Sequence, residues 1–347
     1  MSASAPLLEV SDLKVSFATE DGIVNAVDGV SFSVRAGEVV AIVGESGSGK
    51  SVTSMTLMGL TRGPNARFEG TAKFAGRDLV TAPESELERI RGGDIAMIFQ
   101  DPMSSLDPVY RIGSQIVEQI RAHDSKISKP AAFDRAIELM ERVGVPHARE
   151  RLRSYPHEFS GGMRQRVVIA MALSCNPKLL IADEPTTALD VTTQAQILDL
   201  MRTLQRTHGS SIVIITHDMG VISELADRVV VMYAGRPVEQ GPKRDVIRSP
   251  RHPYTWGLLG AVPRVDGRRN RLATIPGSPI SPLNLPPGCA FGPRCACRFA
   301  ACEAVPPLSG DGAHLDACWL PVEGREGIRV SVTEQAAERS TADGGTA

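Results

Sequence analysis

The chain has 347 residues, of which 38 are basic and 40 acidic, and its formal net charge is −2. A charge so close to zero argues against an extended basic face for nucleic acid, and a hydrophobic content of 42% excludes a wholly disordered chain. The richest apolar run, residues 167–173, is far shorter than the roughly 18 residues that a membrane span requires. The N-terminus has neither a basic start nor an apolar segment that would mark it for export. We therefore expect a cytosolic protein of about two domains.

The chain begins with strand patterns and continues as an α/β sequence. Apolar and polar residues alternate over 13–17 and again over 30–34, which predicts half-buried antiparallel strands. Continuous short apolar runs, typical of buried parallel strands, come next. These runs are residues 39–43, 95–99, 179–182, 212–215 and 229–233. Polar or helical stretches separate them, and this pattern is typical of α/β proteins.

Two further regions differ from this α/β pattern. Between residues 100 and 160, apolar residues recur at helical spacing, for example Ile112, Ile116 and Ile120, which predicts an inserted helical subdomain over about 101–170. After about residue 240, Pro and Gly become frequent, so we expect little regular structure and a small appended module. The polar residues 323–347 predict a disordered tail.

Residues 44–51 read Gly-Glu-Ser-Gly-Ser-Gly-Lys-Ser and match the phosphate-loop pattern G-x-x-x-x-G-K-[ST]. The loop lies between a predicted strand and a predicted helix, where backbone N–H groups and the helix N-terminus bind phosphate. Lys50 is expected to reach the β- and γ-phosphates, and Ser51 to bind Mg²⁺. The residues predicted to bind ATP here are Gly44, Glu45, Ser46, Gly47, Ser48, Gly49, Lys50, Ser51 and Val52.

Two other motifs have chemistry that fits a nucleotide site. Asp183 and Glu184 end an apolar strand, where a doubly wound sheet places its ligands. Asp183 can hold Mg²⁺ through its water shell, and Glu184 can polarise the attacking water. Residues 160–162, Ser-Gly-Gly, open an apolar helix and form a second candidate anion site. Taken alone, the acidic pair fits a solvated strand end and the Ser-Gly-Gly a plain helix cap.

The order of these motifs, with Gln100 and His217 after strands, resembles that of the nucleotide-binding subunits of ABC transporters. The resemblance implies a P-loop NTPase fold of the ABC ATPase type, with an antiparallel β subdomain and an inserted helical subdomain. It also implies ATP hydrolysis with Mg²⁺, and a dimer in which the Ser-Gly-Gly of one subunit completes the ATP site of its partner.

The resemblance also implies residue roles. Phe17 is expected to stack on adenine, and Asp190 to lie in a loop that crosses between subunits. Glu184, His217 and Gln100 are the predicted catalytic residues, with His217 contacting the γ-phosphate and Gln100 contacting both Mg²⁺ and the membrane partner. The predicted sets are Ser51, Gln100 and Asp183 for Mg²⁺, and Ser160, Gly161 and Gly162 for the partner's ATP. Met163 departs from the family pattern, in which a Gln is common, but the phosphate-binding residues before it are intact.

The C-terminal region narrows the resemblance. Residues 251–255, Arg-His-Pro-Tyr-Thr, and the segment 286–295 are similar to the C-terminal extension of oligopeptide and dipeptide importer ATPases. The domains implied are a nucleotide-binding domain over 7–250, an extension over 251–322 and the tail. The function implied is ATP-driven import of di- or oligopeptides, and nickel or glutathione import is the alternative because those importers share the extension.

That function implies partners and a location. The partners are a second, identical or different, ABC ATPase subunit, two transmembrane permease subunits and, indirectly, an extracytoplasmic substrate-binding protein. The location is the cytoplasmic face of the inner membrane, as a peripheral subunit. A soluble ABC ATPase acting on nucleic acid or ribosomes is the alternative of another class, and the single cassette and the net charge of −2 disfavour it. A third alternative is that this chain binds ATP without hydrolysing it, as the silent partner of an active ATPase. The presence of Glu184 and His217 disfavours this alternative.

Five of the six cysteines lie between residues 289 and 318. Cys289, Cys295, Cys302 and Cys318 have the spacing C-x5-C-x6-C-x15-C, which lacks the tight pairs that zinc commonly uses. Four thiolates at irregular spacing suit an iron–sulfur cluster, and zinc or no metal stay open. Resemblance to the peptide importers implies a [4Fe-4S] cluster, with zinc as the runner-up. Cys297 is an alternative ligand or a bystander.

Overall fold

The computed structural model describes residues 5–187, 189–261 and 275–330. A mixed sheet of eight strands forms the centre, in the order β11-β12-β10-β9-β3-β8-β7-β6. In chain order its strands are β3 (Val39–Val43), β6 (Ile95–Ile98), β7 (Leu179–Asp183), β8 (Ser211–Thr216), β9 (Arg228–Tyr233), β10 (Arg236–Pro242), β11 (Ser309–Asp311) and β12 (His314–Asp316). Strands β9, β3, β8, β7 and β6 are parallel, and the other three extend the sheet in antiparallel fashion.

The parallel strands are buried on both faces, which explains their continuous apolar sequences. In β3, Val40 and Ile42 point into one core, whereas Val39, Ala41 and Val43 point into another. The first core lies between the central sheet and the antiparallel sheet, and the second includes the residues of the helical region. The predicted α/β class is therefore confirmed.

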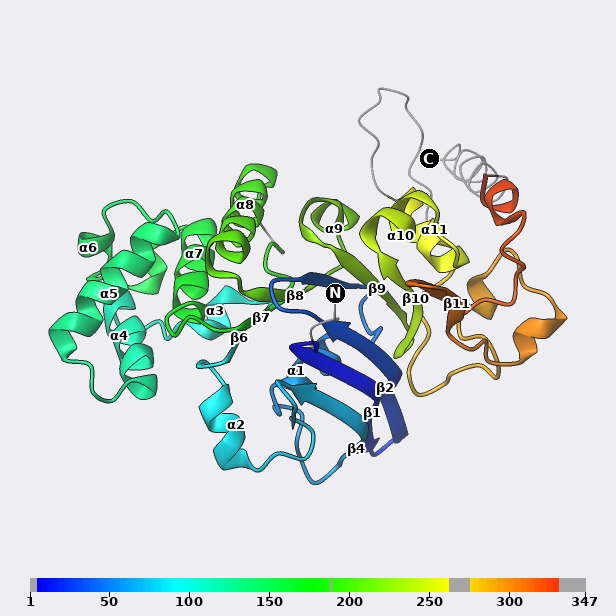
Figure 1. Cartoon of the computed structure of the whole chain (residues 1–347), viewed down its shortest axis with the longest axis horizontal. Coiled ribbons are helices and arrows are strands. Elements are labelled where there is room, and N and C mark those ends of the chain that lie inside the picture. The colour runs from blue at the N-terminus through cyan, green and yellow to red at the C-terminus, as the bar shows by residue number, and fades with distance from the viewer. Residues whose placement is uncertain (1–4, 188, 262–274, 331–347) are drawn as a thin grey trace.

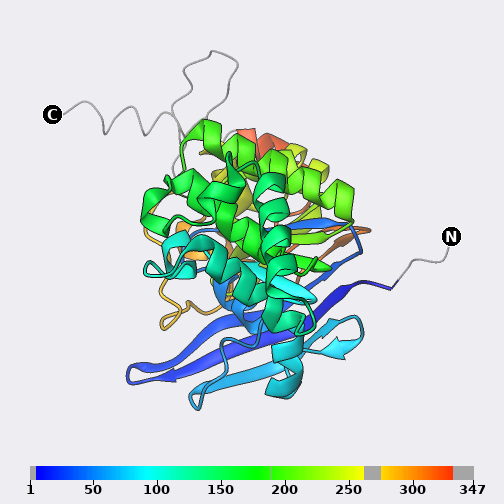
Figure 2. The ribbon, with the colours of Figure 1, turned by 90° about the vertical axis from the view of Figure 1, so that its left-hand side faces the viewer.

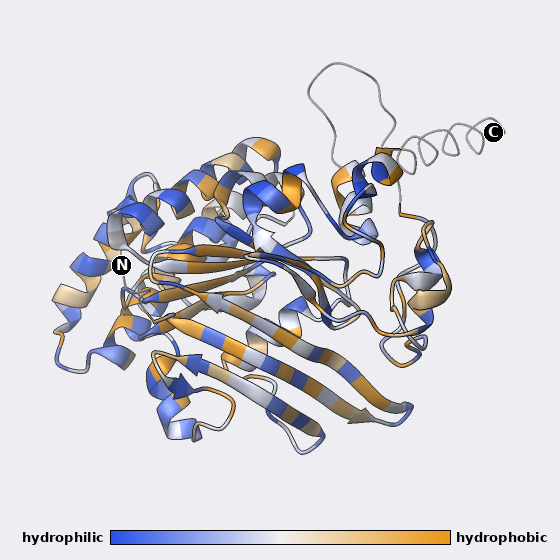
Figure 3. Ribbon diagram, turned by 45° about the vertical axis from the view of Figure 1, so that its right-hand side comes forward, coloured by the Kyte–Doolittle hydropathy of each residue, from blue (hydrophilic) through white to orange (hydrophobic). Residues whose placement is uncertain are grey.

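The second sheet has four antiparallel strands in the order β2-β1-β4-β5. They are β1 (Leu8–Thr19), β2 (Gly22–Val34), β4 (Ala66–Phe74) and β5 (Arg77–Asp78). Hydrophobic and hydrophilic residues alternate along β1, β2 and β4 (Figure 3), because one face of the sheet packs on the core and the other is exposed. Leu13, Val15 and Val30 are fully buried on the inner face.

The described α-helices fall into three groups along the chain. Two lie before the helical region: α1 (Lys50–Leu57) and α2 (Glu84–Ile90). The helical region contains α3 (Pro102–Ser105), α4 (Ile112–His123), α5 (Lys129–Arg142), α6 (Ala148–Arg151) and α7 (Gly161–Ala172). The helices after it are α8 (Val191–His208), α9 (Met219–Leu225), α10 (Lys243–Arg248) and α11 (Pro253–Gly260). Short 3-10 helices cover Pro156–Glu158, Gly292–Arg294 and Ala300–Glu303.

The helical region and the C-terminal segment lie at opposite ends of the molecule, with the sheets between them (Figure 1). Turned by 90°, the helices lie above the antiparallel strands (Figure 2). Ile112, Ile116 and Ile120 are buried on one face of α4, as their spacing predicts. No helix in the described parts of the chain is long and apolar enough to cross a membrane.

The region after residue 240 is more regular than predicted. Helices α10 and α11 both form there. Pro253 occupies the first turn of α11, where proline is favoured, and Tyr254, Thr255 and Trp256 are buried in the same turn. Strand β12 pairs with β10 and so joins the extension to the edge of the central sheet. Only beyond α11 does the described chain become mostly irregular, with short strands and 3-10 turns.

The disordered tail was also predicted to start too early, at residue 323. Residues 325–330 are helical, and Arg325 is buried against Asp316, so the ordered chain extends beyond residue 323. A buried ion pair fixes this segment in a way that its polar composition does not reveal. The remainder of the predicted tail, 331–347, lies outside the described residues.

The double burial of the central sheet makes a testable difference between two isoleucines. Ile214 in β8 is 0% exposed, whereas Ile23 in β2 is 61% exposed. Replacing Ile214 with Ala should lower the free energy of unfolding by about 2–5 kcal/mol, because a buried cavity forms. Ile23→Ala, the control, should change it by less than about 0.5 kcal/mol. Urea denaturation of both variants measures the difference, and equal effects would contradict this packing.

Candidate ATP site

The phosphate loop connects β3 to α1 and packs tightly against the rest of the domain. Gly44 has φ 159° and Gly49 has φ 96°. A Cβ atom on Gly44 would lie 2.2 Å from the carbonyl O of Met232, and one on Gly49 would lie 2.4 Å from the carbonyl O of Ala26. Only glycine fits at these positions, so the loop wraps closely before the helix begins.

Lys50, the first residue of α1, is folded over this loop. Its side-chain Nζ donates to the carbonyl O of Gly44 at 2.7 Å, the carbonyl O of Glu45 at 2.8 Å and the Oγ of Ser48 at 3.3 Å. Burial lowers the pKa of Lys50, and the nearby carboxylates of Glu184, Asp183 and Glu45 act against that shift. The amine therefore lies among negative groups at the start of the helix.

Asp183 and Glu184 stand at the carboxyl end of β7, as predicted for the ligand edge of a parallel sheet. Glu184 has φ 48°, a left-handed conformation that costs a non-glycine residue on the order of 1 kcal/mol or more. Its N–H donates to the carbonyl O of Ile215 in β8 at 2.8 Å. The neighbouring strand thus holds the strained turn that aims the Glu184 side chain out of the sheet.

Three side chains from separate segments converge on the Glu184 carboxylate. Gln100 Nε2 donates to its Oε2 at 2.9 Å, Thr187 Oγ1 donates to the same oxygen at 2.9 Å, and His217 Nδ1 lies 3.2 Å from Oε1. The structure therefore brings together all three predicted catalytic residues. Thr187 was missed, although its position three residues after Glu184 is a spacing at which a hydroxyl often meets a side chain in a turn.

The two adjacent carboxyl groups have pKa values shifted in opposite directions. Burial raises the pKa of Asp183, although a hydrogen bond from Ser51 partly opposes the shift. Burial also acts to raise the pKa of Glu184, but hydrogen bonds from Thr187 and His217 and the charges of His217 and Lys50 outweigh it, so the net shift is downward. Glu184 is thus an ionised hydrogen-bond acceptor at neutral pH, the state that orienting a water molecule requires.

The remaining predicted ATP-binding residues lie apart from this cluster. Ser160 caps α7 by accepting from the N–H of Met163 at 3.4 Å, and Asp190 caps α8 through the N–H and hydroxyl of Thr193. Ser160, Gly161 and Asp190 are exposed, and Phe17 is half-buried in β1. Within the described residues, no hydrogen bond joins Ser160, Gly161 or Gly162 to the phosphate loop of the same chain. Residue 188, in the loop that precedes Asp190, lies outside the described residues.

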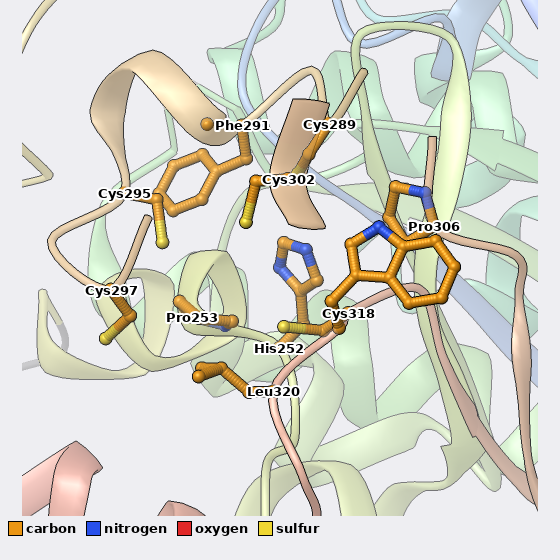
Figure 4. A pocket seen from close by; sticks show the side chains of 12 residues that line it. His252, Pro253, Cys289, Phe291, Cys295, Cys297, Cys302, Pro306, Cys318 and Leu320 are labelled. Atoms are coloured by element: carbon orange, nitrogen blue, oxygen red, sulfur yellow. The ribbon is translucent and has the colours of Figure 1, made fainter. Parts of the chain in front are cut away.

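The cysteines of the extension surround one small cavity. Its lining includes Cys289, Cys295, Cys297, Cys302 and Cys318, together with His252 and Phe291 (Figure 4). All six cysteines are free thiols. Among the residues that the structure describes, however, no three His, Cys, Asp or Glu side chains are arranged to hold one metal ion. The structure thus gathers all four predicted ligands around one cavity, but it does not place them at the mutual distances of a bound metal.

Burial raises the pKa of four of these thiols, which favours their protonated form. It raises the pKa of Cys295 to about 12 and that of Cys318 to about 11, and it also raises the pKa of Cys289 and Cys297. Because metals bind thiolates, binding here would have to release protons and draw the sulfur atoms together.

Two sequence families match this chain. The ABC transporter family matches residues 27–187, which include the phosphate loop and Glu184. The family called oligopeptide/dipeptide transporter, C-terminal region, matches residues 238–302. These include part of the cysteine segment, residues 289–318, which contains five of the six cysteines. The fold and the site therefore define a nucleotide-binding ATPase of the ABC type.

Relatives of known name cover almost the whole chain. The oligopeptide transport ATP-binding protein OppD of Salmonella typhimurium (strain LT2) is 54% identical over 318 residues, which cover 91% of this chain and 94% of the relative. The protein of the same name from Escherichia coli (strain K12) is 53% identical over 91% of this chain and 94% of its own length. The chain belongs to the ATP-binding subunits of oligopeptide ABC transporters, and its activity is ATP hydrolysis.

Solved structures agree with this fold. The cassette MJ0796, in a dimeric post-hydrolysis state bound to ADP and phosphate, superposes with a TM-score of 0.62 at 26% identity, covering 68% of this chain and 99% of that one. The protein cbiO1 of Clostridium perfringens, part of an ABC transporter complex, superposes with a TM-score of 0.60 at 28% identity, covering 71% and 92%.

Replacing Glu184 with Gln should lower ATP turnover by about 100-fold or more, because general-base assistance contributes on this scale. ATP binding should persist, since the phosphate loop is unchanged. Phosphate release and nucleotide titration measure the two effects. Glu224→Gln, at a surface residue paired with Arg202, is the control and should leave turnover near wild type. Unaltered turnover in Glu184→Gln would exclude this residue from the reaction.

Proposed function

We propose that this chain hydrolyses ATP to drive the import of di- or oligopeptides through a membrane permease. The observation that carries the proposal is the combination, in one chain, of an ABC ATPase cassette and the C-terminal region of oligopeptide and dipeptide transporters. The relatives named as oligopeptide transport ATP-binding proteins support the same cargo.

The partners follow from how such a subunit can act. The relatives are named as ATP-binding proteins of oligopeptide transport, which supports a channel formed by other subunits. We propose two transmembrane permease subunits and a second ABC ATPase, with this chain peripheral on the cytoplasmic face of the inner membrane. An extracytoplasmic substrate-binding protein would select the cargo and act on this chain only through the permease.

The exposed position of the Ser160–Gly162 segment supports a face-to-face ATPase dimer. This segment opens α7, and the partial positive charge at the N-terminus of that helix suits a phosphate. Since it does not contact its own phosphate loop, we propose that it contacts ATP bound to the partner, as in the resemblance described above. The dimeric state of MJ0796 supports this arrangement. ATP would then stabilise the closed dimer because only closure brings the two elements together.

We propose that Lys50 and the loop N–H groups hold the phosphates, while Glu184 accepts a hydrogen bond from the attacking water. The water oxygen forms a bond to the γ-phosphorus as the bond to the β,γ-bridging oxygen breaks, and ADP and phosphate are released. His217 and Gln100, which contact Glu184, would orient its carboxylate and face the γ-phosphate. Phe17 would stack on adenine, and Asp190 would lie at the dimer boundary.

The residues proposed for Mg²⁺ have chemistry that fits it. The buried Oδ1 of Asp183 has no hydrogen-bond partner among the described residues, and the Ser51 hydroxyl bonds to the same side chain. Oxygen ligands of this kind are what Mg²⁺ prefers. Asp183, Ser51 and Gln100 would therefore hold the ion. When bound, Mg²⁺ neutralises phosphate charge and orients the phosphate chain.

Peptide cargo is tested by uptake in cells that lack the gene for this chain. Uptake of a radiolabelled tripeptide should be lost, restored by the wild-type gene and not restored by Glu184→Gln, because that variant binds ATP without turnover. Nickel and glutathione uptake, the alternative cargoes, should be unchanged. Loss of nickel or glutathione uptake with normal peptide uptake would overturn the cargo assignment while leaving the ATPase intact.

We also propose that the cysteine segment binds a [4Fe-4S] cluster, with zinc as the runner-up. The support is that all four predicted ligands, Cys289, Cys295, Cys302 and Cys318, line the same cavity. Thiolates in a loop-rich segment are the ligands that such clusters use.

Anaerobically purified wild-type protein should then contain about four irons per chain and absorb broadly near ~400 nm. Cys295→Ser should lose this iron and become more sensitive to proteolysis between residues 285 and 320. Cys175→Ser, at a cysteine outside the cavity lining, is the matched control and should keep the iron. One zinc per chain would favour the zinc site. Protein that contains neither iron nor zinc would refute both proposals.

A further inference from the structure

The phosphate loop is held by side chains from the distant C-terminal extension. The backbone N–H of Glu45, the second residue of the loop, donates to the Tyr254 hydroxyl at 2.7 Å. The Glu45 carboxylate forms a two-pronged ion pair with Arg294, in which Nη1 lies 2.6 Å from Oε2 and Nη2 lies 3.1 Å from Oε1. Tyr254 and Arg294 are 209 and 249 residues away in the sequence, and no local pattern revealed these contacts.

Arg294 is fixed in place on every side. Its side chain is 5% exposed. Besides Glu45, the guanidinium donates to the carbonyl O of Pro276 at 2.9 Å, that of Gly277 at 3.3 Å and the hydroxyl of Tyr233 at 3.4 Å. All three guanidinium nitrogens therefore donate hydrogen bonds to groups other than Glu45. These bonds hold the guanidinium in the orientation in which two of its nitrogens pair with the Glu45 carboxylate.

Tyr254 belongs to a buried aromatic cluster that joins the sheet to the extension. Its ring centroid lies 4.7 Å from that of Tyr233, at the end of β9, and 5.4 Å from that of Phe291, in the cysteine segment. Tyr254 is fully buried. Burial raises the pKa of its hydroxyl above the ordinary value, so the group stays neutral. Its position is thus set by packing, and it offers a fixed oxygen to the loop.

These contacts determine the orientation of the first peptide groups of the loop. The N–H of Glu45 donates to Tyr254, its carboxylate accepts from Arg294, and its carbonyl O accepts from the Nζ of Lys50 at 2.8 Å. Glu45 is therefore anchored through all three of its polar groups. In a loop of this type, the N–H groups of the following residues face phosphate. Because Glu45 is held in place, the orientation of these N–H groups is restricted as well.

We propose that Arg294 and Tyr254 are positioning residues for ATP binding, so that the C-terminal extension is a working part of the nucleotide site. Neither residue touches phosphate; each acts through Glu45. A loop held in its binding conformation loses less freedom when ATP binds, so the contacts raise the affinity for ATP. This inference rests on the proposed role of the phosphate loop, and ATP binding by the wild-type chain tests that role separately.

Arg325, in the helical segment that follows the extension, is a matched control. This arginine is also buried, with a side chain that is 6% exposed, and pairs with Asp316 at 2.7 Å. Its guanidinium also donates to carbonyl groups of the extension, none of which lies in the phosphate loop. Replacing either Arg294 or Arg325 should therefore destabilise the extension. Only the replacement of Arg294 should also disturb the position of the phosphate loop.

The test compares Arg294→Met with Arg325→Met in the full chain, by thermal unfolding and by titration with a fluorescent ATP analogue. Both variants should unfold at a lower temperature than wild type. Only Arg294→Met should bind the analogue more weakly, by about ten-fold, which corresponds to about 1.4 kcal/mol. Equal affinity in Arg294→Met and wild type would overturn the proposal, as would an equal loss in both variants. A wild-type chain that does not bind the analogue would instead refute the ATP site itself.

Further variants keep the proposal testable if Arg294→Met does not fold. Tyr254→Phe removes only the hydroxyl that accepts from Glu45, and it should weaken analogue binding while the aromatic cluster remains. Because Arg294 is proposed to act through Glu45, Glu45→Gln combined with Arg294→Lys should weaken binding by less than the product of the two single effects. Independent effects in the double variant, or normal binding by Tyr254→Phe, would overturn the role assigned to the extension.

Discussion

The parallel pairing of β3, β8 and β7 is the constraint on which the nucleotide site depends. Parallel strands end at the same edge of a sheet, so the phosphate loop after β3, the acidic pair at the end of β7 and His217 after β8 must lie together. The hydrogen bond from the Glu184 N–H to Ile215 then fixes a strained turn. A loop, a carboxylate and an imidazole from distant parts of the sequence become one site because three strands share a register.

A second layer of support comes from the C-terminal extension. Strand β12 adds to the central sheet beside β10, and the fully buried Glu239 of β10 accepts hydrogen bonds from the backbone of Arg251 and His252 and lies 2.8 Å from His314 Nε2. With the extension anchored there, Tyr254 reaches the phosphate loop. Arg294, directly before Cys295, reaches it as well, so the cysteine cavity lies within one residue of a contact to the ATP site. The extension is therefore both an addition to the edge of the sheet and a support for the site.

The site could be predicted from the sequence where its parts are local. Residues 44–51 form a contiguous loop, and Glu184 and His217 stand at strand ends that continuous apolar runs reveal. The contacts of Arg294 and Tyr254 could not be predicted, because they depend on tertiary packing across more than half of the chain. For the same reason, helix α11 was missed: its Pro and two Gly residues favour irregular chain, but burial of Tyr254 and Trp256 outweighs that local preference. Helix α10 contains neither Pro nor Gly, and it was missed because the composition was read over the whole region after residue 240.

We propose that the phosphate loop after β3 binds ATP through Lys50. The most direct measurement is an equilibrium titration of the wild-type chain and Lys50→Ala with ATP. Hydrogen bonds to charged groups contribute about 1.5–3 kcal/mol, so the variant should bind ATP at least about ten-fold more weakly than wild type. Lys178→Ala, at a surface residue paired with Asp94, should bind like wild type. Equal affinity of Lys50→Ala and wild type would contradict the account of the site.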